Sequence, residues 1–122
     1  MKPMRADLQG TWAVTSYRSG EAMVEPDEGS QAHLVVDGSQ VSGTMGINRF
    51  AGQFGGDPAF GAMAVTRMAG PPDLMLQEDT LLELLQAADA VEVSDDGMFV
   101  RRDGLLLMEL ERSGTIEVSP TS

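Results

Sequence analysis

One amphipathic segment, with short turn-separated apolar stretches on both sides, most constrains how this chain can fold. Pro71-Pro72-Asp73 predicts the boundary of a helix, with Asp73 as its N-cap. At ~100° per residue the helix has an apolar stripe, which consists of Leu74, Leu81, Leu82, Leu85 and Ala88. The opposite face carries Asp79, Glu83, Gln86 and Ala87. The pattern predicts a single helix that packs on a sheet.

The segments before this helix are predicted to form strands. Residues 8–17 alternate with period two; Leu8, Gly10, Trp12 and Val14 are expected on one face, and Thr11, Thr15 and Tyr17 on the other. The breakers and acids of 18–31 predict a loop. Strands are expected at 32–37, 40–45 and 59–67, with a hairpin turn at Asp37-Gly38. Between them, 46–54 is a glycine-spaced return and 55–58 a turn.

After the helix, three apolar stretches at 90–93, 98–102 and 105–111 surround turns at Asp95-Asp96-Gly97 and Asp103-Gly104. This spacing predicts an antiparallel meander. Strands, one helix and then strands, without regular βαβ alternation, favour an antiparallel α+β fold. A length of 122 residues is typical of one small domain.

Composition excludes several classes of protein. Eight Lys and Arg against 19 Asp and Glu give a net charge of -11, which repels nucleic-acid phosphates and anionic lipid. No apolar run approaches the ~18 residues of a membrane span, and the polar start lacks the apolar core of a signal peptide. The absence of cysteine fits a reducing compartment. We therefore expect a cytoplasmic protein, or one of the cell envelope if an export signal has been removed.

The candidate chemical motifs favour structural explanations. His33 is the single histidine and is expected on a sheet face. The sequence has no Gly-x-Ser-x-Gly motif whose serine could act with it as a nucleophile. No ligand spacing for zinc or calcium and no phosphate-binding glycine pattern is present. We expect no catalytic, cofactor-binding or metal residues and no cofactor. Five of the nine methionines are expected in the core: Met63, Met68, Met75, Met98 and Met108.

Glu78 is the most informative residue, because it lies inside the apolar stripe of the helix. A buried carboxylate is costly unless it is paired or hydrogen-bonded. Arg67 is the expected partner, with Arg49 second. A structural ion pair between helix and sheet is favoured over a perturbed acid in a pocket.

Several ordered motifs resemble the META domain family, also called HslJ-like, over residues 8–112. They are Leu8-Gln9-Gly10-Thr11-Trp12, then Gly46-Ile47-Asn48-Arg49-Phe50-Ala51-Gly52, Thr66-Arg67-Met68-Ala69-Gly70 and the helix residue Glu78. Residues 113–122 are expected to be a flexible C-terminal tail. Ile47 and Gly70 stand where the family often has cysteine, which suggests that these two positions face each other and that no thiol chemistry operates here.

The resemblance implies a curved antiparallel sheet or partly open barrel closed by the helix, and no established catalytic mechanism. The motif residues receive structural roles: Gly46 and Gly52 would permit tight turns or positive φ, Asn48 would bond neighbouring backbone, and Phe50 and Trp12 would anchor the core. We expect a non-catalytic, stress- or envelope-associated accessory module that interacts with another protein. The alternative is a module that binds a small apolar ligand between sheet and helix.

Overall fold

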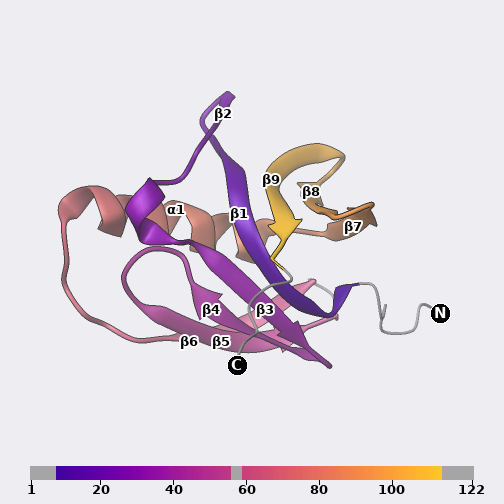
Figure 1. The fold of residues 1–122 in the computed structure, drawn as a ribbon, viewed down its shortest axis with the longest axis horizontal. Coiled ribbons are helices and arrows are strands. Elements are labelled where there is room, and N and C mark those ends of the chain that lie inside the picture. Colours follow the sequence, from indigo (N-terminus) through magenta and orange to yellow (C-terminus); the bar gives the residue numbers. More distant parts are fainter. Residues whose placement is uncertain (1–7, 56–58, 114–122) are drawn as a thin grey trace.

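The computed structural model describes residues 8–55 and 59–113. Within these ranges the chain forms one α-helix, α1 (Pro72–Ala87), and nine strands (Figure 1). The strands are β1 (Gly10–Ser19), β2 (Ala22–Val24), β3 (His33–Asp37), β4 (Gln40–Thr44), β5 (Arg49–Phe54), β6 (Phe60–Val65), β7 (Ala90–Ser94), β8 (Gly97–Arg102) and β9 (Leu105–Arg112). A short 3-10 turn, η2 (Glu28–Ser30), precedes β3. The predicted α+β class is confirmed.

All described strand pairs are antiparallel and belong to one sheet. The order is β6-β5-β4-β3-β1-β9-β8-β7, with β2 paired to β1. The sheet curls into a half-barrel, and α1 lies behind β1 and β3 in Figure 1. The predicted hairpin at Asp37-Gly38 joins β3 to β4, and the predicted C-terminal meander is β7-β8-β9.

The core lies between α1 and the inner face of the curled sheet. The side chains of Trp12, Leu34, Phe60, Leu81 and Leu85 are at most 1% exposed. Trp12 Nε1 donates a hydrogen bond of 2.9 Å to Leu8 O, so the indole nitrogen is satisfied inside the core. Phe50 is also buried, as expected of a core anchor.

The predicted stripe of α1 is largely confirmed, because Leu81, Leu85 and Ala88 are buried. The predicted N-cap is wrong. The helix begins at Pro72, with Pro71 as the N-cap residue, and Asp73 lies in the first turn. Proline has no N–H and a fixed φ, so it starts a helix without a side-chain cap.

A register shift between Val14 and Ser16 changes which residues of β1 face the core. The shift reverses the alternation, so Tyr17 packs against the core instead of the outer face that its position predicts. The predicted loop at 18–31 contains β2, which extends the hairpin from β1.

Two of the predicted core methionines are on the surface. Met68 is 59% exposed and Met75 is 40% exposed, because both lie where the chain enters α1 and not beneath it. Met98 and Met108 are buried, and Met63 packs against the core. The predicted turn at 55–58 lies outside the described residues beyond Gly55, and so does the predicted tail beyond Ser113. In the part of the chain that the structure describes, no helix is long and apolar enough to span a membrane.

Candidate functional site

The carboxylate of Glu78 is the centre of a buried hydrogen-bond network. Its Oε1 accepts the backbone N–H of Ile47 at 2.8 Å and of Asn48 at 2.5 Å. Its Oε2 accepts Asn48 Nδ2 at 2.8 Å. Glu78 is 5% exposed, and these three donors satisfy the charge without a cation. The helix is thereby tied to the segment that leads into β5.

Asn48 extends this network to the segment between β6 and α1. Its Oδ1 accepts the N–H of Met68 at 2.6 Å and the hydroxyl of Thr66 at 2.9 Å. Its Nδ2 also donates to Met68 O at 3.1 Å, while the Thr66 hydroxyl accepts the N–H of Arg49 at 3.0 Å. The Asn48 side chain does bond backbone, but that of Met68, 20 residues away, and not the neighbouring backbone that was expected. The motif residues of three separate segments form one buried network.

The predicted ion pair between Glu78 and Arg67 is wrong. Burial by itself raises the pKa of Glu78, but the hydrogen bonds from Asn48 and Ile47 outweigh burial, and the net pKa lies below 4.5. The charge of Arg67 makes the smallest contribution to this lowering. The side chains of Arg67 and Arg49 are exposed. Backbone N–H groups satisfy the carboxylate instead, and residue types alone do not reveal where those groups point.

Gly46 and Gly52 of the motifs are required because other parts of the backbone approach them closely. A Cβ on Gly46 would lie 2.9 Å from Leu74 O, and one on Gly52 would lie 2.6 Å from Ala62 O. Neither has a positive φ, so that part of the expectation is wrong. Gly46 lets the loop before β5 touch α1, and this contact brings the amides of the loop to Glu78.

Ile47 and Gly70 face each other, as the loss of both family cysteines suggests. A Cβ on Gly70 would lie 2.5 Å from Ile47 Cδ1. The Ile47 side chain therefore occupies the space that a side chain at position 70 would need. The contact joins the same two segments that Asn48 connects.

Gln77 is a second polar anchor, which the sequence analysis missed. Its Nε2 donates to Ser30 Oγ and to Met45 O, both at 3.0 Å, and its Oε1 accepts the N–H of Asp27 at 2.7 Å. Gln77 is 6% exposed. Its position three residues after Leu74 and four before Leu81 is the signal that would have placed it on the buried stripe.

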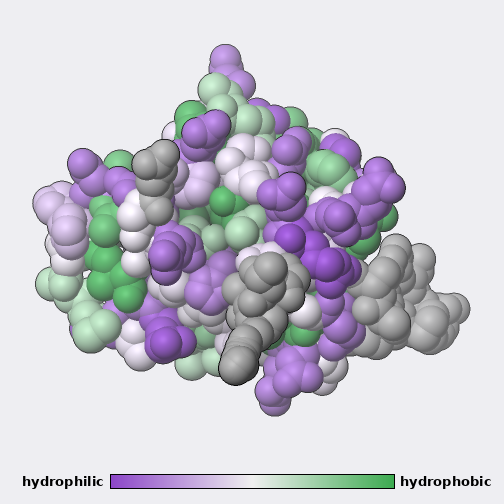
Figure 2. Space-filling model, in the orientation of Figure 1, coloured by the Kyte–Doolittle hydropathy of each residue, from purple (hydrophilic) through white to green (hydrophobic). Residues whose placement is uncertain are grey.

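His33 lies on β3, partly exposed, with Nδ1 2.9 Å from Gln31 O. It borders a hollow of about 810 Å³ on the outer face of the sheet, together with Thr11, Ala13 and Val35. Figure 2 shows green surface within the hollow part of this face. None of the four hollows described on the molecule is lined by a residue of α1. Core side chains of the sheet and of α1 pack against each other in the space between them.

The hydrogen bonds that the Glu78 carboxylate accepts limit the chemistry that this site can perform. The Glu78 carboxylate is ionised and already accepts three hydrogen bonds, so it is not poised to exchange a proton. In residues 8–55 and 59–113, no group of three or more His, Cys, Asp or Glu side chains is placed to hold a metal ion. The network holds α1, the segment before β5 and the segment between β6 and α1 against one another.

Comparisons with known proteins agree with this architecture. The META domain family model matches residues 6–114. A protein from Burkholderia xenovorans, solved by NMR, has a TM-score of 0.73 and 21% identity, with 94% of this chain and 92% of that chain covered. A second NMR structure has a TM-score of 0.60 and 20% identity, covering 88% of this chain and 95% of that one. At these identities the likeness shows the fold. No curated protein matches the sequence.

Proposed function

We propose that this chain, which belongs to the META domain family, is a non-catalytic protein-interaction module. The buried network supports this proposal, since the motif residues Asn48, Thr66 and Glu78 hold segments of the chain together by hydrogen bonds. Association with stress or with the cell envelope, and the compartment itself, stay predictions from the sequence.

The observation that carries the proposal is an exposed apolar patch on a rigid support. We define the α1-start patch as Met68, Met75 and Leu76, whose exposed fractions are 59%, 40% and 67%. Figure 2 shows green surface over the end of α1 that Figure 1 connects to β6. Met68 lies in the segment that enters α1, and Met75 and Leu76 lie in its first turns, so three exposed apolar side chains surround one helix start. Apolar side chains that gather on a surface are typical of protein interaction sites.

The Glu78 network fixes the position of this patch. The backbone N–H and C=O of Met68 both bond to Asn48, which bonds to Glu78 on α1. Met68 is thus held although its side chain is exposed. A binding surface whose backbone is already ordered loses less conformational entropy when a partner binds.

Photo-crosslinking in cells tests the proposal. A photoreactive phenylalanine at position 68 or 76 is expected to give a discrete protein adduct, whereas the same group at exposed Glu83 or Gln86 on α1 gives none. With the cross-linker at 76, Met68→Glu should remove the adduct without lowering the melting temperature. Absence of an adduct from 68 and 76, or the same adducts from all four positions, would refute an interaction role for the patch.

A further inference from the structure

The edge of the sheet at β6 is unusual in composition. β6 ends the strand order, and no other described strand pairs with its outer side. Its sequence, Phe-Gly-Ala-Met-Ala-Val, has no charge and no proline, and Ala62 and Ala64 are exposed. Proteins normally protect such edges with charges, prolines or bulges, because the unpaired N–H and C=O groups invite another strand. β6 has one register shift, at residues 61 and 62, whereas Met63, Ala64 and Val65 pair with β5 in regular register.

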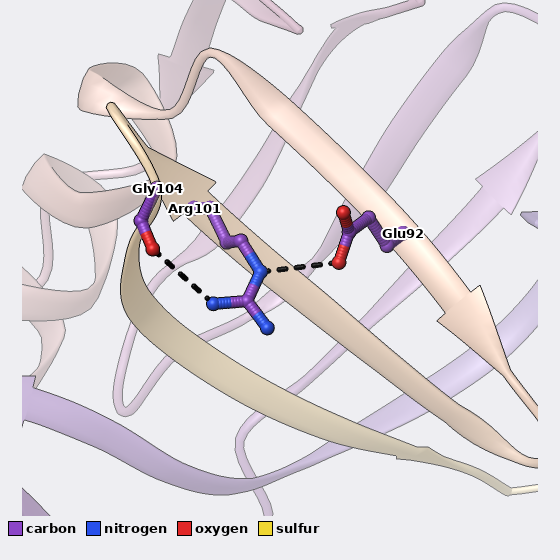
Figure 3. Close-up of polar contacts among 3 residues, drawn as sticks. All are labelled: Glu92, Arg101 and Gly104. Atoms are coloured by element: carbon purple, nitrogen blue, oxygen red, sulfur yellow. Dashed lines mark hydrogen bonds and ion pairs between the residues drawn. The ribbon is translucent and has the colours of Figure 1, made fainter.

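The opposite edge, β7, has this protection. Glu92 stands at the middle of the strand, and its carboxylate accepts Arg101 Nε at 3.1 Å (Figure 3). The exposed acids Asp89 and Asp95 stand at its two ends. The two ends of the strand order therefore differ, since the β7 edge is charged and the β6 edge is not.

Two arginines stand at the end of β6 where the chain leaves the sheet. Arg67 follows the strand by two residues, and Arg49 lies across from Thr66, whose N–H donates to Arg49 O at 3.0 Å. Both side chains are exposed. Among described residues, neither guanidinium makes a hydrogen bond or an ion pair, whereas those of Arg18, Arg101, Arg102 and Arg112 do. In a chain of net charge -11, Arg49 and Arg67 gather positive charge at this end of β6, and the charge of Arg67 also acts on the Glu78 carboxylate.

We propose that β6 binds an extended, acidic segment of a partner protein, which adds to the sheet as a tenth strand. This inference rests on the proposed interaction function and identifies the kind of partner. The backbone of β6 supplies the strand pairing, and Arg49 and Arg67 pair with carboxylates of the segment. Met68 follows Arg67 directly, so the β6 edge continues into the α1-start patch.

An antiparallel addition, like every described pair of this sheet, sets the polarity of the segment. Every described strand pair is antiparallel, and an added antiparallel strand begins where β6 ends. The acidic residues therefore belong at the N-terminal end of the segment, beside Arg67. The small side chains of Gly61, Ala62 and Ala64 leave room for larger side chains across the new pair.

A blocked synthetic peptide of two aspartates followed by three Thr-Val repeats tests this proposal in solution. Titration of the labelled protein, followed by NMR, is expected to shift the amides of β6 and to slow their hydrogen exchange. A peptide with the aspartates at the C-terminal end should bind about 10-fold more weakly. So should the variant Arg49→Gln/Arg67→Gln, whereas Arg102→Gln, which removes the same charge at the other end of the sheet, should bind as the natural chain does.

The edge itself is tested with Ala64→Glu, which places a negative charge on β6 that repels an acidic segment, and with peptides N-methylated at alternate residues. Both should abolish the β6 shifts. Absence of β6 shifts at millimolar peptide, equal affinity for the double arginine variant, or a concentration-dependent dimer that forms through β6 would overturn the inference. If the adducts from positions 68 and 76 persist in that case, only the β6 site fails; if they are absent too, the interaction function fails with it.

Discussion

Replacement of Glu78 by glutamine tests whether donors, and not a cation, satisfy this buried carboxylate. The amide oxygen of glutamine can still accept the N–H groups of Ile47 and Asn48, but its NH₂ group faces Asn48 Nδ2, which is also a donor. Rotation of the Asn48 amide does not relieve this conflict, because its oxygen already accepts Met68 N and the Thr66 hydroxyl.

The expected cost follows from these contacts. A hydrogen bond to a charged group contributes ~1.5–3 kcal/mol, and an unsatisfied buried group costs ~1–3 kcal/mol. Glu78→Gln loses one charge-assisted bond, weakens two more and opposes two donors. We therefore expect the free energy of unfolding to fall by ~2–4 kcal/mol, a large share of the ~5–15 kcal/mol typical of a domain.

Urea titration provides the assay, because Trp12 is the single tryptophan and is fully buried, so its emission reports unfolding. In a double-mutant cycle, Glu78→Gln and Asn48→Ala should couple by ~0.5–3 kcal/mol. The cycle of Glu78→Gln with Arg67→Ala should be additive within ~0.5 kcal/mol. Equal stability of Glu78→Gln and the natural chain, or strong coupling to Arg67 instead of Asn48, would refute the assignment of the carboxylate to this network.

Three further predictions follow from the same contacts. Since the pKa of Glu78 is below 4.5 in the folded chain, its stabilisation is complete above that value and is lost as pH falls through the folded pKa; the stability gap to Glu78→Gln, measured by urea titration, should therefore close under acid, and a gap independent of pH would contradict this. Leu85→Ala should cost ~2–5 kcal/mol in thermal or urea unfolding, whereas Leu76→Ala, at 67% exposure, should cost under ~0.5 kcal/mol. Ile47→Cys/Gly70→Cys should form a disulfide on oxidation and gain up to ~3 kcal/mol relative to its reduced form; free thiols after oxidation, by mass spectrometry, would disprove the facing geometry.

The sequence predicted the elements whose pattern is local. Helix α1 followed from the spacing of Leu81 and Leu85, and the hairpins followed from their Asp-Gly turns. Tyr17 was misplaced because a register shift in β1 depends on pairing with a strand about 90 residues away. The period-two pattern of the β1 sequence contains no information about a register shift that arises from pairing with β9.

The sequence predicted only part of the candidate site, again because contacts between distant residues cannot be read from a local pattern. Glu78 was found because a carboxylate in an apolar stripe is conspicuous, and Asn48 was expected to bond backbone. The choice of Arg67 as partner was wrong because charge is visible in a sequence, whereas the direction of the Ile47 and Asn48 N–H groups is set only in the folded chain. Met68 was assigned to the core by its type, although its segment enters α1 from outside.

The pairing of β1 with β9 determines the order in which the strands can pair during synthesis. Trp12 and Arg112 are partners in the sheet although they lie at opposite ends of the described chain, and the Arg112 guanidinium lies 4.2 Å from the centre of the indole ring. During synthesis β1 can pair with β3 early, but its other side has no neighbour until β9 has left the ribosome. Contacts of such large sequence separation slow folding and leave an open strand edge in the interval. A nascent chain of this protein therefore completes its sheet only after β9 has been synthesised.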